Sequence, residues 1–389
     1  MKIAMIGQKG LPGKFGGVET HVAELAPRLA RFGHDVVAYA RYWYTPKTVR
    51  SYFQVRVVRL PSIHTKNLDA ITHTFLATVH ALFVERPDVY HFHGVGPSLL
   101  AFLPRILAPR ATVLSTFHSV DRTHAKWSFF ARFMLKLGER AAVAFPHQTI
   151  AVSQSIASYV KKEYGARATY VPNGITPVRA SVNDDLLEQF GLVSFRYIAM
   201  VSRLVRHKGQ HTLIAAWKYL QKHNASAIKG MKLAIIGDGA FTDTYVRELK
   251  ELAQGDDSIV FTGNQSGPAL QALFMGTRFV VHPSVSEGLP IALLEAMSYG
   301  KAVIAADIPE NKEVVADHGI IVPKSDEKAL AREIADLLKD PMHAASLGHS
   351  GRAYVETSFN WDDIAIDVLR CYRGNETIYA SDLPALATE

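Results

Sequence analysis

Residues 282–315 read HPSVSEGLPIALLEAMSYGKAVIAADIPENKEVV, and this stretch decides the fold. The apolar run at 279–283 has the length of a buried strand, and a polar loop with a glycine follows it. Pro290 suits a helix start, because its φ angle is already helical and its missing N–H is not needed there. Strong helix formers continue to Gly300, which is placed to end the helix, and 302–306 is apolar again. The stretch therefore predicts a strand, a glycine loop, a helix and a second strand.

Two carboxylates, Glu287 and Glu295, stand in this stretch with seven residues between them. Glu287 lies in the loop before the helix, and Glu295 lies more than one turn inside it, where a carboxylate can accept hydrogen bonds from a ribose diol. The helix N-terminus carries partial positive charge and suits a phosphate, held by backbone N–H groups near Gly288, Leu289 and Ile291. Taken singly, each glutamate is explained as a capping acid or an exposed helix residue. Taken with the glycine, the proline and the flanking strands, the pair predicts a binding site.

The spacing resembles the E-x7-E signature of retaining glycosyltransferases of sequence family 4, which have the GT-B fold. The resemblance implies that Glu287 lies near the transferred sugar and that Glu295 contacts the nucleotide ribose. It also implies that the intervening backbone, near Gly288, Leu289 and Ile291, holds the diphosphate of a nucleotide sugar donor.

The composition is that of an ordinary globular protein, with 389 residues, 48% hydrophobic and 20% charged. The net charge of +7 is typical of a protein with an acidic partner such as phosphate, nucleic acid or an anionic membrane, and equally of a mildly basic protein without one. Cys371 is the one cysteine, so no internal disulfide forms, which fits a reducing compartment. The opening MKIAMIG lacks a signal-peptide layout, and no run approaches the ~20 apolar residues of a membrane span. We therefore expect a cytoplasmic protein, soluble or peripheral on the inner face of the plasma membrane.

The chain opens with another strand, glycine loop and helix. Residues 3–6 are apolar, and a helical apolar pattern then runs to Gly33. This arrangement raises the alternative of an NAD-dependent oxidoreductase. The glycines, however, do not fit G-x-G-x-x-G, and the next strand ends near Arg41 without a convincing acid. Both observations argue against NAD.

The phrase QKGLPGKFGGVETH at 8–21 is instead most similar to bacterial polysaccharide enzymes of the same glycosyltransferase family. The resemblance implies that Gly16 and Gly17, at the helix start, approach the donor phosphate and sugar. Lys9 and Lys14 either meet anionic groups there or are solvated loop lysines.

Polar side chains end two of the following strands. His91 and His93 lie two apart on the strand expected at 88–93 and point the same way, but no third ligand is evident, which favours core or cleft histidines over a metal site. His118 ends the strand expected at 111–118, at the edge where α/β sheets bind ligands. The family resemblance implies that His118 hydrogen-bonds the donor sugar and shapes the reacting centre.

Residues 121–143 are expected to form an amphipathic helix. Aromatic residues cover the arc next to a broad basic side, as in helices that lie on a membrane surface. An ordinary surface helix with its apolar side in the core explains the pattern as well. The basic residues are Arg122, Lys126, Arg132, Lys136 and Arg140.

A second α/β domain begins after the mixed, linker-like residues 175–195. Its first expected strand, at 197–202, leads into a turn with Arg203 and Lys208, two cations that suit a diphosphate. The resemblance implies that Arg203 and Lys208 neutralise the leaving diphosphate without a metal ion, and no convincing D-x-D motif for a metal is present. It also implies that Gly263 lines the nucleotide base.

The prediction for the whole chain is two doubly wound α/β domains facing each other across a cleft. The N-terminal acceptor-side domain takes 1–178 with a returning helix in 364–389, and the donor-binding domain takes 179–363. The resemblance covers nearly the whole chain. It implies retaining transfer of a hexose-type sugar from a nucleotide diphosphate sugar to a hydroxyl acceptor, without cofactor or metal, in polysaccharide or glycolipid synthesis. Glu287 then orients or stabilises the sugar and is not a nucleophile.

Three alternatives to this prediction differ in class. A sugar-nucleotide epimerase or a phosphorylase uses the same architecture, and the dinucleotide oxidoreductase is weakened by the failed fingerprint. A non-catalytic basic protein would bind nucleic acid with strong salt dependence, but the sequence contains no nucleic-acid motif in its favour.

A lipid-linked acceptor would make attachment to an anionic membrane through 121–143 useful.

Overall fold

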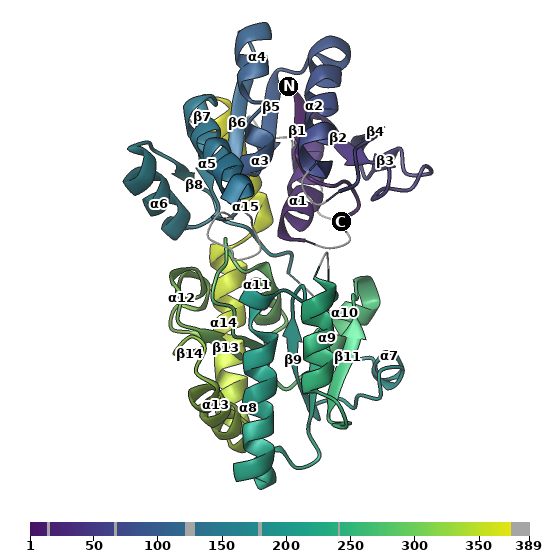
Figure 1. The fold of residues 1–389 in the computed structure, drawn as a ribbon, viewed down its shortest axis with the longest axis vertical. Coiled ribbons are helices and arrows are strands. Elements are labelled where there is room, and N and C mark those ends of the chain that lie inside the picture. Colours follow the sequence, from purple (N-terminus) through teal and green to yellow (C-terminus); the bar gives the residue numbers. More distant parts are fainter. Residues whose placement is uncertain (14–15, 66–67, 121–128, 178–180, 240–241, 375–389) are drawn as a thin grey trace. The chain divides into compact units, whose positions relative to one another are not determined.

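The computed structural model describes residues 1–13, 16–65, 68–120, 129–177, 181–239 and 242–374 (Figure 1). Contacts between Cα atoms divide the chain into two compact units. Unit 1 comprises Met1–Asn173 and Trp361–Glu389, and unit 2 comprises Gly174–Asn360. The predicted boundaries, after residue 178 and before residue 364, lie a few residues away from these positions.

Unit 1 is built on an eight-stranded sheet in the order β3-β4-β2-β1-β5-β6-β7-β8. All neighbouring strands run parallel except β3, which forms an antiparallel hairpin with β4. The central strands β1 and β2 are buried on both sides, which explains why they read as nearly continuous apolar runs. The strands are β1 (Lys2–Ile6), β2 (Asp35–Arg41), β3 (Ser51–Tyr52), β4 (Val55–Leu60), β5 (Val89–His93), β6 (Thr112–Phe117), β7 (Gln148–Ala151) and β8 (Thr169–Tyr170).

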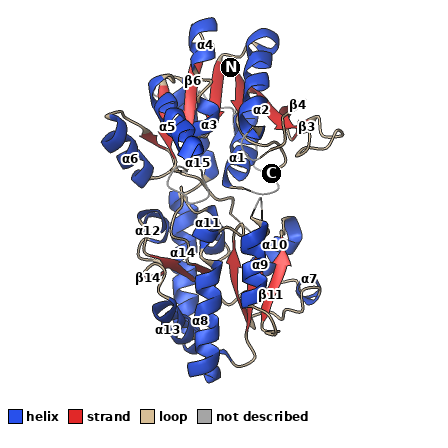
Figure 2. Ribbon diagram, in the orientation of Figure 1, coloured by secondary structure: helices blue, strands red, loops and turns tan. Residues whose placement is uncertain are grey.

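Helices cover both faces of this sheet, as Figure 2 shows. Successive residues of a strand point to opposite faces, so Ile3 and Met5 join the core beneath α1 and α15, while Ala4 and Ile6 join the core beneath α2. The helices are α1 (Gly17–Arg31), α2 (Asp69–His80), the π-helix η1 (Ala81–Glu85), α3 (Val95–Ser98), α4 (Phe102–Leu107), α5 (Phe129–Ala144), α6 (Gln154–Tyr164) and α15 (Trp361–Tyr372).

Unit 2 is built on a six-stranded parallel sheet in the order β11-β10-β9-β12-β13-β14. The strands are β9 (Tyr197–Val201), β10 (Lys232–Ile236), β11 (Ile259–Gly263), β12 (Val280–His282), β13 (Val303–Ala306) and β14 (Ile320–Val322). Trp217 and Ile334 belong to one apolar cluster with strand residues such as Ile198, so α8 and α13 cover the same core. The helices are α7 (Asp184–Glu188), the 3₁₀ turns η3 (Arg206–Lys208) and η4 (Ala225–Ile228), α8 (Gln210–His223), α9 (Asp243–Leu252), α10 (Gly267–Gly276), α11 (Ile291–Ser298), α12 (Pro309–Val315), α13 (Glu327–Lys339) and α14 (Pro341–Ser358).

Each sheet reverses its strand order at one place. In unit 1, β1 lies between β2 and β5, and in unit 2, β9 lies between β10 and β12. The connections on the two sides of such a switch point leave in opposite directions and open a crevice beyond the carboxyl ends of the strands. Ligands of open α/β sheets bind in this crevice. The topology therefore directs attention to the loops after β1, β5, β9 and β12.

Helix α15 completes the core of unit 1 although it follows unit 2 in the sequence. Trp361 is 1% exposed and packs in the same apolar cluster as α1. On the surface of this contact, the Arg28 guanidinium donates to Asp362 Oδ1 at 2.8 Å.

The predicted α/β architecture is confirmed, with local differences. Helix α2 continues into a π-helical turn, η1, and the linker expected at 175–195 contains the short helix α7. The β3–β4 hairpin was not predicted. The helix expected at 121–143 is described only from Phe129, so Arg122 and Lys126 lie outside the described residues. None of the described helices is long and apolar enough to span a membrane.

Candidate active site

The loops after β9 and β12 pack against each other at the switch point of unit 2. The backbone N–H of Val285 donates to the carbonyl of His207 at 2.8 Å, and the Ser284 hydroxyl donates to the same carbonyl at 3.1 Å. Gly209 has a φ of 82°, and a Cβ there would lie 2.4 Å from the Pro283 carbonyl oxygen, so only glycine allows this approach. The two loops therefore form one continuous surface.

Glu287 and Lys208 meet on this surface. The Lys208 ammonium donates to Glu287 Oε1 at 2.5 Å, and His282 Nε2 lies 2.8 Å from the same oxygen. Burial alone would raise the pKa of the Glu287 carboxyl, but the Lys208 charge and the His282 hydrogen bond outweigh it and lower the pKa far below its usual range. Glu287 is therefore an ionised group that holds Lys208 in place.

Arg203 follows the end of β9 and is half-buried. The Gln210 side-chain amide donates to the Ser202 hydroxyl and to the Arg203 carbonyl, both at 2.8 Å, and so fixes the backbone at this point. No carboxylate of the described residues forms an ion pair with Arg203. Arg206 lies between Arg203 and Lys208 in the sequence, and its guanidinium forms an ion pair with Glu248.

The other predicted donor-site residues lie on the loops and helix around this surface. Gly288 and Leu289 are buried before α11, and Glu295 is half-buried on it. Pro290 caps the helix, which begins at Ile291. Gly263 ends β11 with a φ of 72°, and its carbonyl accepts from the Gly237 N–H at 2.9 Å.

The loop after β1 occupies the switch point of unit 1. A Cβ on Gly7 would lie 2.6 Å from the carbonyl oxygen of His93, so the loop passes close to the end of β5. Gly16 has a φ of 107°, and α1 begins at Gly17. The Lys9 ammonium lies 3.7 Å from Glu19 Oε2, so Lys9 is a paired loop residue, and Lys14 lies outside the described residues.

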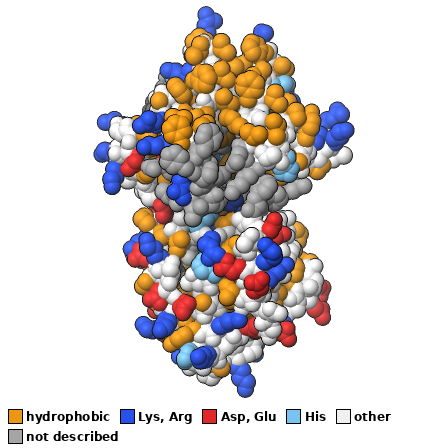
Figure 3. Space-filling view, in the orientation of Figure 1, with side chains coloured by type: hydrophobic (Ala, Val, Ile, Leu, Met, Phe, Trp, Pro, Cys, Tyr) orange, Lys and Arg blue, Asp and Glu red, His pale blue; other side chains and the backbone are white. Residues whose placement is uncertain are grey.

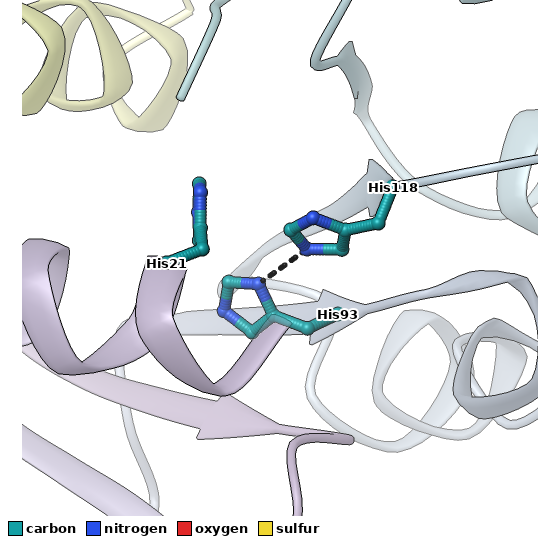
Figure 4. A group of neighbouring side chains, drawn as sticks. All are labelled: His21, His93 and His118. Atoms are coloured by element: carbon teal, nitrogen blue, oxygen red, sulfur yellow. Dashed lines mark hydrogen bonds between the residues drawn. The ribbon is translucent and has the colours of Figure 1, made fainter. Parts of the chain in front are cut away.

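Three histidines gather at this switch point, one each from α1, the end of β5 and the end of β6 (Figure 4). His93 Nδ1 lies 3.3 Å from His118 Nε2, and the His21 and His118 rings are 4.8 Å apart. Burial lowers the pKa of His21 to about 4 and holds the pKa values of His93 and His118 well below the usual range. At neutral pH the three imidazoles are therefore uncharged hydrogen-bonding groups.

Among the residues that the structure describes, these three histidines form the group that could hold a metal ion. Their ligand atoms all lie within 4.8 Å of one another, and neutral imidazole is a common ligand of zinc. His91 stays apart, because its ring nitrogens contact the Tyr372 hydroxyl at 2.8 Å and the Thr116 hydroxyl at 2.6 Å. That a metal plays no part in the reaction stays a prediction.

Sequence reasoning missed three participants. His282 ends a parallel strand, and this is the signal by which His118 was found. His21 ends the glycine-loop phrase at 8–21. Its Nδ1 lies 2.9 Å from Asn173 Oδ1, and local sequence patterns do not indicate a contact between residues so far apart in the chain. Gln210 carries no sequence signal of its own.

Family models match both halves of the chain. The model described as Glycosyltransferase Family 4 matches residues 15–179, and the model described as Glycosyl transferases group 1 matches residues 186–354.

Curated relatives match over most of their length. A GDP-mannose-dependent alpha-(1-6)-phosphatidylinositol monomannoside mannosyltransferase of Mycolicibacterium smegmatis is 28% identical, with 90% of this chain and 93% of the relative covered. An alpha-maltose-1-phosphate synthase of the same species is 27% identical over 96% of this chain and 99% of the relative.

Solved structures share the fold. Anabaena HepE in complex with UDP and glucose has a TM-score of 0.79 at 20% identity, covering 96% of this chain and 100% of that one. Sucrose-phosphate synthase from Thermosynechococcus elongatus has a TM-score of 0.81 at 22% identity, covering 96% and 98%. The chain belongs to glycosyltransferase family 4, the group 1 glycosyl transferases, and has the GT-B fold.

Proposed function

We propose that this glycosyltransferase moves a hexose-type sugar from a nucleotide diphosphate sugar to a hydroxyl acceptor with retention of anomeric configuration, and that unit 2 binds the donor. The observation that carries the proposal is the meeting of Lys208 with Glu287 beside Arg203 at the β9–β12 switch point. Two cations on a fixed surface suit a diphosphate, which the protein must hold while the glycosidic bond breaks.

The leaving diphosphate is stabilised by charge and by backbone dipoles. Arg203 can bind two phosphate oxygens through its planar guanidinium, while Lys208 acts as a point charge that Glu287 keeps in position. The N-terminus of α11, near Gly288, adds backbone N–H donors. Most of the rate enhancement then comes from electrostatics and positioning, without a covalent protein intermediate.

The sugar is oriented by groups that do not exchange protons with it. Glu287 stays ionised and accepts hydrogen bonds from sugar hydroxyls rather than acting as a nucleophile. His118 belongs to unit 1 and is neutral at pH 7, so it hydrogen-bonds the donor sugar as an uncharged imidazole. The acceptor attacks from the face that the diphosphate leaves.

Unit 1 is proposed as the acceptor-binding unit. The name of the mannosyltransferase relative contains a lipid, phosphatidylinositol monomannoside, which supports a lipid-linked acceptor here. Such an acceptor fits a role in glycolipid or polysaccharide synthesis at the inner face of the plasma membrane.

Donor binding is tested by thermal shift with UDP-, GDP-, ADP- and dTDP-sugars. A ligand that binds only the folded state raises the unfolding temperature, and we expect one nucleotide class to do so. Glu295→Gln should weaken binding of that donor about ten- to hundredfold, because a hydrogen bond to a charged group contributes about 1.5–3 kcal/mol.

The matched control is Glu251→Gln, an exposed glutamate at the end of α9, which should leave the donor Kd unchanged. A wild-type protein that no nucleotide sugar stabilises would overturn the proposed function. Equal affinity in Glu295→Gln and wild type would overturn only the role of Glu295.

Transfer should proceed without a metal ion. With radiolabelled donor and acceptor, we expect full activity in EDTA and a product whose anomeric configuration, measured by NMR, is that of the donor. Activity that EDTA abolishes and Mg²⁺ or Mn²⁺ restores would contradict metal independence. Conversion of the radiolabelled donor into another nucleotide sugar in the absence of acceptor would indicate an epimerase.

A further inference from the structure

Helix α2 and the π-helical turn η1 expose apolar side chains. Phe83 and Val84 are each 64% exposed, and Phe75 and Leu76 are exposed about two turns earlier. Asp69 and Glu85 are the only charged residues between 69 and 85, and neither is exposed. The solvent-facing side of this helical segment is therefore apolar and uncharged.

The buried side of the same segment combines the small apolar residues Ala77 and Ala81 with polar residues. The hydroxyls of Thr74 and Thr78 donate to carbonyls four residues earlier, at 2.7 and 2.8 Å. Glu85 receives two hydrogen bonds from Arg56, at 2.7 and 2.8 Å. The bulky apolar side chains of this segment therefore face outwards, while its small and polar side chains face inwards. An ordinary surface helix has the opposite distribution.

The exposed apolar side chains continue onto two neighbouring helices. Ile106 of α4 is 69% exposed, and the Phe102 and Phe145 rings, 5.8 Å apart, join α4 to the end of α5. Figure 3 shows apolar side chains gathered over this part of unit 1. Single exposed apolar residues are ordinary, but a gathered patch marks an interaction surface. The docking face comprises Phe75, Leu76, Phe83, Val84, Ile106, Leu107, Phe133 and Phe145.

Exposed cations outnumber exposed acids in the chain segment that carries the docking face. Of the described acids between residues 69 and 145, Asp69, Glu85 and Glu139 are buried and bonded within the protein, and Asp88 is exposed. The exposed cations outnumber it. They are Arg86, Arg105, Arg110, Arg132, Lys136 and Arg140.

We propose that the docking face binds an anionic lipid bilayer. Aromatic and aliphatic side chains that enter the interface, with cations that reach anionic head groups, are the two components of peripheral membrane binding. A second copy of the chain fits poorly, because a symmetric contact would bring two cation-rich segments of like charge together. The inference rests on the proposed lipid-linked acceptor, and it assigns the apolar contact to α2, η1 and α4. Helix α5, for which the sequence left a membrane-surface role and an ordinary core-packed helix both open, contributes the exposed cations Arg132, Lys136 and Arg140.

The full chain is mixed with phosphatidylcholine vesicles that contain or lack phosphatidylglycerol, and bound protein is measured by sedimentation. We expect binding to the anionic vesicles that falls as salt rises, because salt screens the charge attraction. Changing Phe75, Leu76, Phe83 and Val84 together to serine should lower the partition coefficient about tenfold or more, since buried apolar area drives insertion. Arg105→Glu with Arg110→Glu should weaken binding mainly at low salt.

The matched control changes Leu252 and Met342, exposed apolar residues of unit 2, to serine, and should bind like wild type. If the four-serine variant misfolds, the pairs Phe83→Ser with Val84→Ser and Ile106→Ser with Leu107→Ser replace it.

Three results would overturn the inference. In the first, the wild-type protein does not bind anionic vesicles at low salt. In the second, the wild type and the serine variants bind these vesicles equally. In the third, the wild type is a dimer and the serine variants are monomers. Donor binding, measured by thermal shift without vesicles, reports on the proposed function separately. A serine variant that binds the donor normally but does not bind vesicles supports the docking face. If the wild-type protein binds vesicles but no nucleotide sugar, the docking face is supported and the proposed function is wrong.

Discussion

Replacing Lys208 by alanine is expected to lower the turnover number for sugar transfer about a hundred- to thousandfold, the effect of removing one fixed charge at a leaving group. Arg203→Ala should act similarly, because both cations meet the diphosphate in the proposed mechanism. The measurement is the turnover number at saturating donor and acceptor. Thermal unfolding of each variant is recorded alongside, since Lys208→Ala also leaves the buried Glu287 without its ammonium partner.

Arg206→Ala is the matched control for these two variants. Arg206 lies in the same turn, but its guanidinium pairs with Glu248 and lies 4.9 Å from the centre of the Tyr245 ring. Its removal should change turnover by no more than a few fold. If the three variants lost activity equally, a diffuse positive surface, and not two placed cations, would explain donor binding.

Trp361→Ala is expected to lower the free energy of unfolding of unit 1 by about 3–5 kcal/mol, the usual loss for a buried tryptophan. Trp361 is 1% exposed, and its ring packs edge-on to His21 at 5.4 Å. Hydrogen exchange should therefore accelerate in β1, α1 and α15. Chemical unfolding, monitored by the same exchange, gives the magnitude.

Trp217→Ala provides the complementary control. Trp217 is fully buried in unit 2, where its indole N–H donates to the Ser258 hydroxyl at 2.9 Å. Its loss should accelerate exchange in β9 and β10 and leave β1 protected. Faster exchange in unit 2 after Trp361→Ala would show that α15 belongs energetically with the residues that precede it in sequence.

Local patterns in the sequence predict the elements of unit 2 well, because strand, glycine loop and helix are each encoded over a few residues. Lys208 and Glu287 were identified separately, 79 residues apart. Their contact depends on β9 lying beside β12, and strand order is set by the packing of the whole sheet. For the same reason, the role of His282 as a partner of Glu287 was not predicted.

The docking face shows a different limit of sequence reasoning. Apolar residues recur at helical spacing between residues 70 and 84, which is typical of a helix, but the spacing does not tell which side is buried. Small residues such as Ala77 and Ala81 fill the narrow space against the sheet, while the larger Phe75 and Phe83 face outwards. Only the separation between helix and sheet decides this, and it is a tertiary property.

The return of α15 to unit 1 sets an order of events during protein synthesis. Residues 1–173 leave the ribosome first, but the side chains of α15 that close their core come after residue 360. At about 5–20 residues per second, the intervening residues 174–360 take roughly 10–40 s to synthesise. Throughout that time the apolar surface of α1 that α15 covers remains open on the nascent chain, as a target for chaperones. The unit that is synthesised second is therefore the first able to complete its fold.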